Sequence, residues 1–102
     1  MYAIIRLNSF DPAKLASAAA DLAKFDRIHA AQPGFLGSVA VSLDEHRRLA
    51  LNLWEDSAAS RAGLSVLGPH VARLLLPAMS EPSQLIGAGE VIAFDLRHPV
   101  EG

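Results

Sequence analysis

The chain contains no cysteine, which excludes disulfide bonds, thiolate metal sites, iron–sulfur clusters and cysteine nucleophiles. It also has no excess of positive charge, because 9 Lys and Arg stand against 11 Asp and Glu and the formal net charge is −2. The basic field that holds a phosphate backbone is therefore missing. We expect no nucleic-acid partner.

Long apolar runs are also missing. No stretch approaches the roughly 20 apolar residues of a membrane span, and residues 1–6 are not a basic segment that leads into an apolar run. We therefore expect no membrane partner and a cytoplasmic location. The 102 residues suffice for a single domain over residues 1–102. A chain of this size buries about two thirds of its unfolded surface, so a mean hydropathy of +0.25 leaves apolar area for a partner and suggests a dimer.

Hydrophobic periodicity predicts the order strand, helix, strand, strand, helix, strand. Residues 2–10 are apolar and β-branched, and Asp11 and Pro12 then suit the first turn of a helix over residues 13–31. Residues 35–43 and 49–54 alternate and predict a hairpin. The pattern beyond them predicts a helix over 58–66 that Gly68-Pro69 interrupts before 70–76, a loop over 77–89, a last strand over 90–96, and a frayed tail over 97–102.

This order predicts an α+β, ferredoxin-like βαββαβ fold: a four-stranded antiparallel sheet with both helices on one face. Alternation then divides the two central strands into two faces. The odd-numbered residues are large and aliphatic, so we expect them to pack under the helices: Ile5, Leu7, Leu49, Leu51 and Leu53. The even-numbered residues mix small, amide and aromatic side chains, as a cavity lining does: Ile4, Arg6, Asn8, Phe10, Ala50, Asn52 and Trp54. A second copy facing this surface would close a barrel, which predicts a homodimer with one cavity per subunit.

Four segments of the chain, in this order and spacing, resemble the motifs of a known protein family: Gln32-Pro33-Gly34-Phe35-Leu36-Gly37, Leu53-Trp54-Glu55-Asp56, Gly68-Pro69-His70 and Gly89-Glu90-Val91-Ile92. With them the sequence resembles, over nearly its whole length, the antibiotic biosynthesis monooxygenase (ABM) family of dimeric α/β barrels. The resemblance implies the fold and the homodimer. It does not fix the function, because the family includes cofactor-free oxygenases of polycyclic phenols, haem-degrading enzymes, isomerases and members without known activity.

Two amides and one indole are the first candidates for the site. Asn8 and Asn52 can hold a substrate hydroxyl or steady an oxyanion, or else cap strand ends. Trp54 offers an aromatic wall, or else packs at a dimer interface. With the two central strands taken as parallel, we expect Asn8 at the same end of the sheet as Trp54.

Two charged or titratable side chains complete the candidates. Arg6 can hold a phenolate or carboxylate, or else pair with an acidic residue such as Glu90. His70 occupies the position of a family histidine and can act as general base or haem ligand, or else face solvent. Ile4, Phe10 and Ala50 are expected to add apolar substrate-binding surface.

The first functional hypothesis is a cofactor-independent monooxygenase of a small phenol or quinol. Asn52, Trp54 and Asn8 would bind and activate the substrate while His70 moves the proton, with no cofactor. The alternative is a non-catalytic dimer that binds a small apolar or aromatic ligand. Haem degradation is disfavoured, because the tryptophan that this branch of the family needs near Gly63 or Leu64 is missing. We expect no metal, because His29, His46 and His98 lack metal-ligand spacing.

Overall fold

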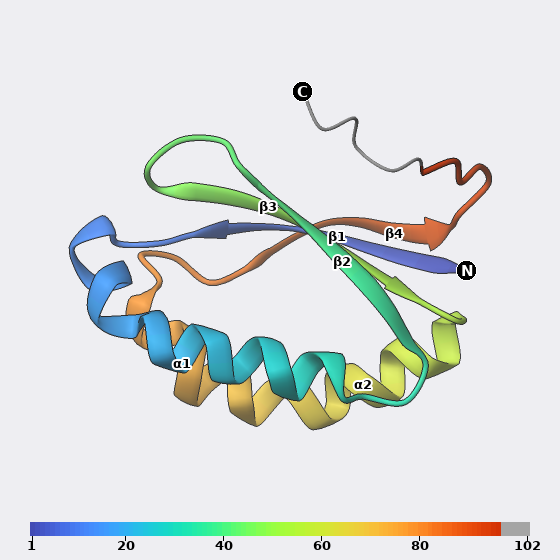
Figure 1. Cartoon of the computed structure of the whole chain (residues 1–102), viewed down its shortest axis with the longest axis horizontal. Helices are drawn as coiled ribbons and strands as arrows, with labels where there is room; N and C mark the ends of the chain where they lie inside the picture. The colour runs from blue at the N-terminus through green and yellow to red at the C-terminus, as the bar shows by residue number, and fades with distance from the viewer. Residues whose placement is uncertain (97–102) are drawn as a thin grey trace.

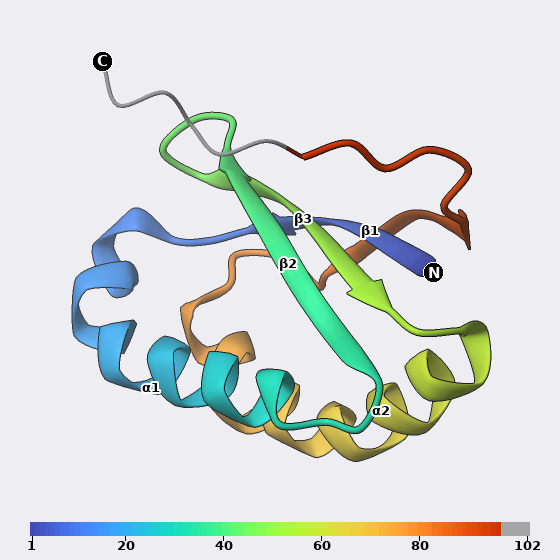
Figure 2. The ribbon, with the colours of Figure 1, turned by 45° about the vertical axis from the view of Figure 1, so that its right-hand side comes forward.

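A four-stranded antiparallel sheet carries the helices on one of its faces in the computed structural model, which describes residues 1–96 (Figure 1). The elements are β1 (Tyr2–Ser9), α1 (Pro12–Ala30), β2 (Phe35–Ser42), β3 (Arg47–Trp54), α2 (Ser57–His70) and β4 (Gln84–Glu90). The strand order is β2-β3-β1-β4, with every neighbouring pair antiparallel. The predicted ferredoxin-like α+β fold is confirmed. Figure 2 shows the helices together beneath the sheet and the loop between β2 and β3 at the top, on the side away from the helices.

Both helices begin at an aspartate that caps free backbone N–H groups. The Asp11 carboxylate accepts a hydrogen bond of 3.0 Å from the backbone N–H of Ala13, and Asp56 accepts one of 2.7 Å from that of Ala59. Pro12 then occupies the first turn of α1, where its missing N–H costs nothing. The predicted start of α1 therefore differs from the observed one by a single residue.

The second helix is not interrupted at Gly68-Pro69, as the sequence pattern predicted. α2 continues through Pro69 to His70, and the irregular part begins directly after it, in the π-helix η1 (Val71–Leu75) and the 3₁₀-helix η2 (Leu76–Ala78). Proline lacks the N–H that would donate a hydrogen bond to the preceding turn, so the backbone hydrogen bonds after it can change from the i→i−4 to the i→i−5 pattern. The bond from the Leu76 N–H to the Val71 carbonyl is of this i→i−5 kind.

The last strand was predicted too late in the chain. β4 covers Gln84–Glu90, whereas residues 91–96 lie outside the sheet. Gly87 and Gly89 resemble loop residues, but both pair with β1 in an edge strand whose register shifts between Ile5 and Arg6. The expected tail over 97–102, with His98, lies outside the described residues.

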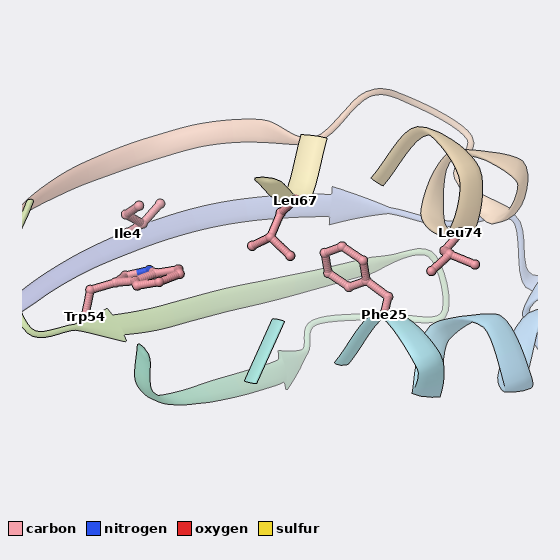
Figure 3. Close-up of a cluster of buried hydrophobic side chains, with 5 residues drawn as sticks. All are labelled: Ile4, Phe25, Trp54, Leu67 and Leu74. Atoms are coloured by element: carbon pink, nitrogen blue, oxygen red, sulfur yellow. The ribbon is translucent and has the colours of Figure 1, made fainter. Parts of the chain in front are cut away.

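The two faces of the sheet have the reverse of their predicted roles. Ile4, Phe10 and Trp54, which were expected to face a second copy, are buried under the helices with exposed fractions of 4%, 5% and 0%. Figure 3 shows the main cluster, in which Ile4 and Trp54 of the sheet lie at one end and three side chains from the helix layer continue it: Leu67, Phe25 and Leu74. The odd-numbered aliphatic residues lie on the open face of the sheet. Both faces are apolar, so composition does not reveal which one the helices cover.

A helical glycine makes room for the indole at the centre of this cluster. Gly63 of α2 is buried against the Trp54 ring, and a Cβ built on it would collide with Trp54 Cη2 and lie 2.7 Å from Cζ3. The contact fixes the distance between α2 and β3 at this point. It therefore sets one end of the space between the sheet and the helices.

Candidate functional site

A two-lobed cleft lies between the helices and the even-numbered face of the sheet. The first lobe, of about 290 Å³, runs from β1 and β3 to an apolar wall from α2 and η1 that includes Leu64, Leu67 and Val71. The second lobe, of about 410 Å³, opens between α1 and the strands β2 and β3. The residues that border both lobes are Asn8, Phe25, His29, Ala50, Asn52 and Leu75. A single chain therefore builds this cleft, without the second copy that the sequence analysis invoked to enclose it.

Most of the predicted site residues line this cleft. The first lobe is bordered by six of the eight: Ile4, Arg6, Asn8, Ala50, Asn52 and Trp54. Phe10 borders only the second lobe, where the guanidinium carbon of Arg48 lies 5.2 Å from the centre of its ring. His70 borders neither lobe. Its Nδ1 lies 2.8 Å from a guanidinium nitrogen of Arg73 on the outer surface, so it is not placed to exchange a proton with a ligand in the cleft.

The expected convergence of Asn8 with Trp54 does not occur, because β1 and β3 are antiparallel. Asn8 pairs with Arg48, and Trp54 pairs with Tyr2 at the other end of the strands. The direction follows from the connections: α1 returns the chain so that β2 runs parallel to β1, and the tight hairpin then reverses β3. Six residues along β3 separate the two positions, which is about 20 Å of strand. Asn52 lies between them, opposite Ile4.

His29 is a cleft residue that the sequence analysis did not select. It follows Phe25 by one turn of α1 and borders both lobes. Its ring meets those of Phe35, Trp54 and Phe25 at centroid distances of 4.6, 5.5 and 5.8 Å. Burial lowers the pKa of His29 below 6.5, with the Asp26 carboxylate acting in the opposite direction. The imidazole is therefore neutral at pH 7 and can accept a proton.

Several polar groups in the first lobe lack a protein partner. Trp54 Nε1 and Ser83 Oγ are buried without a hydrogen bond to any of the described residues 1–96. Arg6 forms no ion pair within residues 1–96, and Glu90, its suggested partner, lies 3.9 Å from the N-terminal ammonium group instead. Buried polar groups are nearly always satisfied in folded proteins, so these atoms indicate a place for polar atoms of a ligand or water.

Two further features bear on the kind of site this is. The described part of the chain holds no group of three His, Asp or Glu side chains placed to bind a metal ion. None of the helices within residues 1–96 is both long and apolar enough to cross a membrane.

Comparison with known proteins identifies the fold. The sequence matches no family model, and it matches no curated protein. Among solved structures, a Nitrosomonas europaea protein of unknown function, NE2512, shares 18% identity over 96% of this chain and 95% of its own, with a TM-score of 0.75.

Two other structures connect the fold with oxygenases. A mutant of SnoaB, a cofactor-independent oxygenase from Streptomyces nogalater, shares 19% identity over 91% of this chain and 94% of its own, with a TM-score of 0.71. An antibiotic biosynthesis monooxygenase shares 12% identity over 91% of this chain and 100% of its own, with a TM-score of 0.73. At these identities the likeness establishes the fold alone, and it confirms the predicted resemblance to the ABM fold.

Proposed function

We propose that this protein is a cofactor-independent monooxygenase that oxidises an electron-rich phenol or quinol in the two-lobed cleft. The observation that carries the proposal is that the neutral imidazole of His29 and the amides of Asn8 and Asn52 border both lobes of one largely apolar cleft. A base and amide donors on an aromatic surface are the groups that convert a phenol into a held phenolate. The fold shared with SnoaB, a cofactor-independent oxygenase, supports the same reaction class.

In this mechanism the substrate supplies the electrons and the protein supplies position and charge. His29 accepts the phenolic proton, and the Asn52 amide donates to the resulting phenolate oxygen. The phenolate reduces dioxygen, and a C–O bond forms at an unsubstituted ring carbon to give a hydroperoxide. Cleavage of the O–O bond with loss of the ring hydrogen releases water and a quinone. The balance is phenol plus dioxygen to quinone plus water, so no external reductant is consumed.

His29 replaces His70 as the proposed proton acceptor, because it borders the cleft and His70 does not. His29→Gln is expected to lower kcat by about 10²–10⁴-fold with a naphthol or hydroquinone as substrate. The charged groups around the cleft are Asp26 from its own helix and Arg6 and Arg48 from the sheet. Since burial lowers the pKa of His29, the wild-type rate should hold as the pH falls to 6.5 and decline only below it.

The measurement is dioxygen consumption across this pH range, with mass spectrometry of the product formed under isotopically labelled dioxygen. The product should gain one labelled oxygen atom. His46→Gln, on the exposed hairpin, is the matched control and should retain the wild-type rate and pH profile. A bound phenol without dioxygen consumption would refute the oxygenase and favour the ligand-binding alternative. A His29→Gln variant with the wild-type pH profile would refute the role of His29.

We also propose that the protein is a homodimer joined through the odd-numbered face of the sheet. This face is aliphatic and open: Val39 and Val41 have exposed fractions of 50% and 44%, and Leu51 pairs with Ile5 and Val39 at its centre. An exposed apolar sheet surface of this kind marks a protein interface, and a face that packs on itself gives a closed pair. The cleft lies on the opposite face.

Leu51→Glu is therefore expected to yield a monomer, because it places two charges at the centre of an apolar interface. Native mass spectrometry of the wild-type and variant proteins measures this directly. Val66→Glu is the control, since Val66 is equally exposed, at 51%, but lies on α2. A monomeric wild-type protein, or a Leu51→Glu variant that stays dimeric, would contradict this interface.

A further inference from the structure

Among residues 1–96, Arg6 is the only charged side chain that borders the first lobe of the cleft. It lies on β1 opposite Ala50 of β3 and Leu85 of β4, and it is partly buried. No carboxylate within residues 1–96 pairs with it. A guanidinium that faces an apolar space loses solvation without compensation, so its position favours a ligand that brings a negative charge.

Two uncharged polar side chains lie at the same end of the lobe. Gln84 of β4 pairs with Leu7, so the preceding residue, Ser83, comes beside the end of β1 that carries Asn8. Asn8 and Ser83 both border the first lobe, and Ser83 Oγ is buried without a hydrogen-bond partner. Guanidinium, amide and hydroxyl groups can all donate hydrogen bonds, and an oxygen anion with two acceptor atoms matches such a set.

The charges that line the whole cleft, like Arg6 alone, favour a negatively charged ligand. The second lobe adds one cation, Arg48, and one anion, Asp26, so the lining carries two positive charges against one negative charge. The cleft is therefore net positive within a chain whose formal net charge is −2. Arg48 and Asp26 are exposed and therefore screened by water and salt, whereas Arg6 is partly buried and is screened less, so Arg6 contributes most of the preference for an anion over a neutral molecule of the same shape.

The opposite end of the lobe carries a second donor. Trp54 Nε1 is buried without a partner, and an indole N–H can only donate. Trp54 lies four residues along β3 from Ala50, the partner of Arg6, which is about 13 Å of strand. Between these two ends the lining is apolar and aromatic. A flat ring system with an anionic group at one end fits this apolar stretch.

We propose that the natural ligand of the cleft is an aromatic carboxylic acid. Its carboxylate binds Arg6, Asn8 and Ser83, and its ring system packs along the apolar lining of the lobe towards Trp54. The inference rests on the proposed function, because it takes from it that the cleft is where the phenol or quinol is oxidised. It adds the substrate class, which is a phenol or quinol that also bears a carboxylate. The guanidinium is a recognition group in this arrangement, and the oxidised ring lies beside His29 and Asn52.

The test compares two probes of nearly equal shape, naphthoate and naphthamide, by isothermal titration calorimetry at neutral pH. Wild-type protein is expected to bind the carboxylate about tenfold more tightly or better, because a charge-assisted pair replaces a neutral one. Arg6→Gln should abolish this preference, whereas Arg61→Gln, an identical charge change on the exposed side of α2, should keep it. Ser83→Ala, a smaller change than Arg6→Gln, should weaken binding of the carboxylate alone.

Three results would overturn the proposal: equal affinity for the two probes, no binding of naphthoate at millimolar concentration, or a preference that survives in Arg6→Gln. Wild-type preference should persist at high salt, because a partly buried pair is screened less than a surface field. The oxygenase proposal fails independently. Tight naphthoate binding with no dioxygen consumption on hydroxynaphthoates leaves the ligand class standing, and oxidation of neutral naphthols without any carboxylate preference leaves the oxygenase standing.

Discussion

Replacing Gly63 with alanine is expected to lower the free energy of unfolding by about 2 kcal/mol, although alanine is the better helix former by about 1 kcal/mol. The reason is the indole of Trp54. The added methyl group would collide with Cη2 and lie 2.7 Å from Cζ3 of a side chain that is fully buried. Because the interior is close-packed, α2 must move away from β3 or the ring must leave its rotamer.

Urea unfolding monitored by circular dichroism measures this change, and the same helix offers the control. Beyond its chain neighbours and its own helix, Gly68 has no atom within 4 Å of a built Cβ, so Gly68→Ala creates no tertiary clash. Because Pro69 follows and disfavours a helical residue with a Cβ, the helix-propensity gain is offset, and the free energy of unfolding should change by less than about 1 kcal/mol. Trp54→Phe removes the colliding part of the ring, and in that background Gly63→Ala should cost little or become stabilising. If the Gly63→Ala and Gly68→Ala proteins were equally stable, the tight contact between α2 and β3 would not exist.

Asn52→Ala is expected to lower kcat by about 10²–10³-fold while the fold and the subunit assembly stay unchanged. Asn52 borders both lobes, and on β3 it faces Ile4 on one side and Ser38 on the other. No residue within 1–96 occupies its amide, which can therefore donate to an oxygen in the cleft, and the truncation removes that donor. KM should change less than kcat, because the interaction strengthens as the phenolate forms.

Steady-state rates with a phenol measure the loss of kcat, and native mass spectrometry of the same samples shows whether the subunit assembly has changed. Gln84→Ala removes an amide from the exposed face of β4 and should keep the wild-type kcat. Asn52→Asp keeps the shape but places a negative charge where the phenolate forms, so it should be at least as slow as Asn52→Ala. Full activity in Asn52→Ala would remove this amide from the mechanism.

Most of the fold was predictable because its signals are local. The Asp caps, the apolar spacing on α1 and the hairpin all lie within a few residues of the elements they define. The errors arose where distant contacts override local preference. β4 contains two glycines and still pairs with β1, and α2 passes through Pro69 because its neighbours hold it in place.

The site was partly predictable for a similar reason. Strict alternation along β1 and β3 grouped the cleft residues correctly, since residues two apart share a face. Which face the helices cover is a matter of contacts between separate elements, such as that of Gly63 with Trp54, and sequence spacing does not contain them. The position of His29 was predictable from the sequence. It follows Phe25 by four residues and so lies on the apolar side of α1, where a titratable imidazole is unusual and indicates a candidate site residue.

The alternation along the central strands also limits how this protein can evolve. Each residue of β1 and β3 belongs either to the cleft or to the open aliphatic face, so inserting or deleting one residue would exchange the two surfaces over the rest of the strand. Substitutions at even-numbered positions, in contrast, alter the cleft without touching the other face. New ligand preferences can therefore arise by point mutation in these strands, whereas changes in chain length are confined to the 44–46 turn and similar connections.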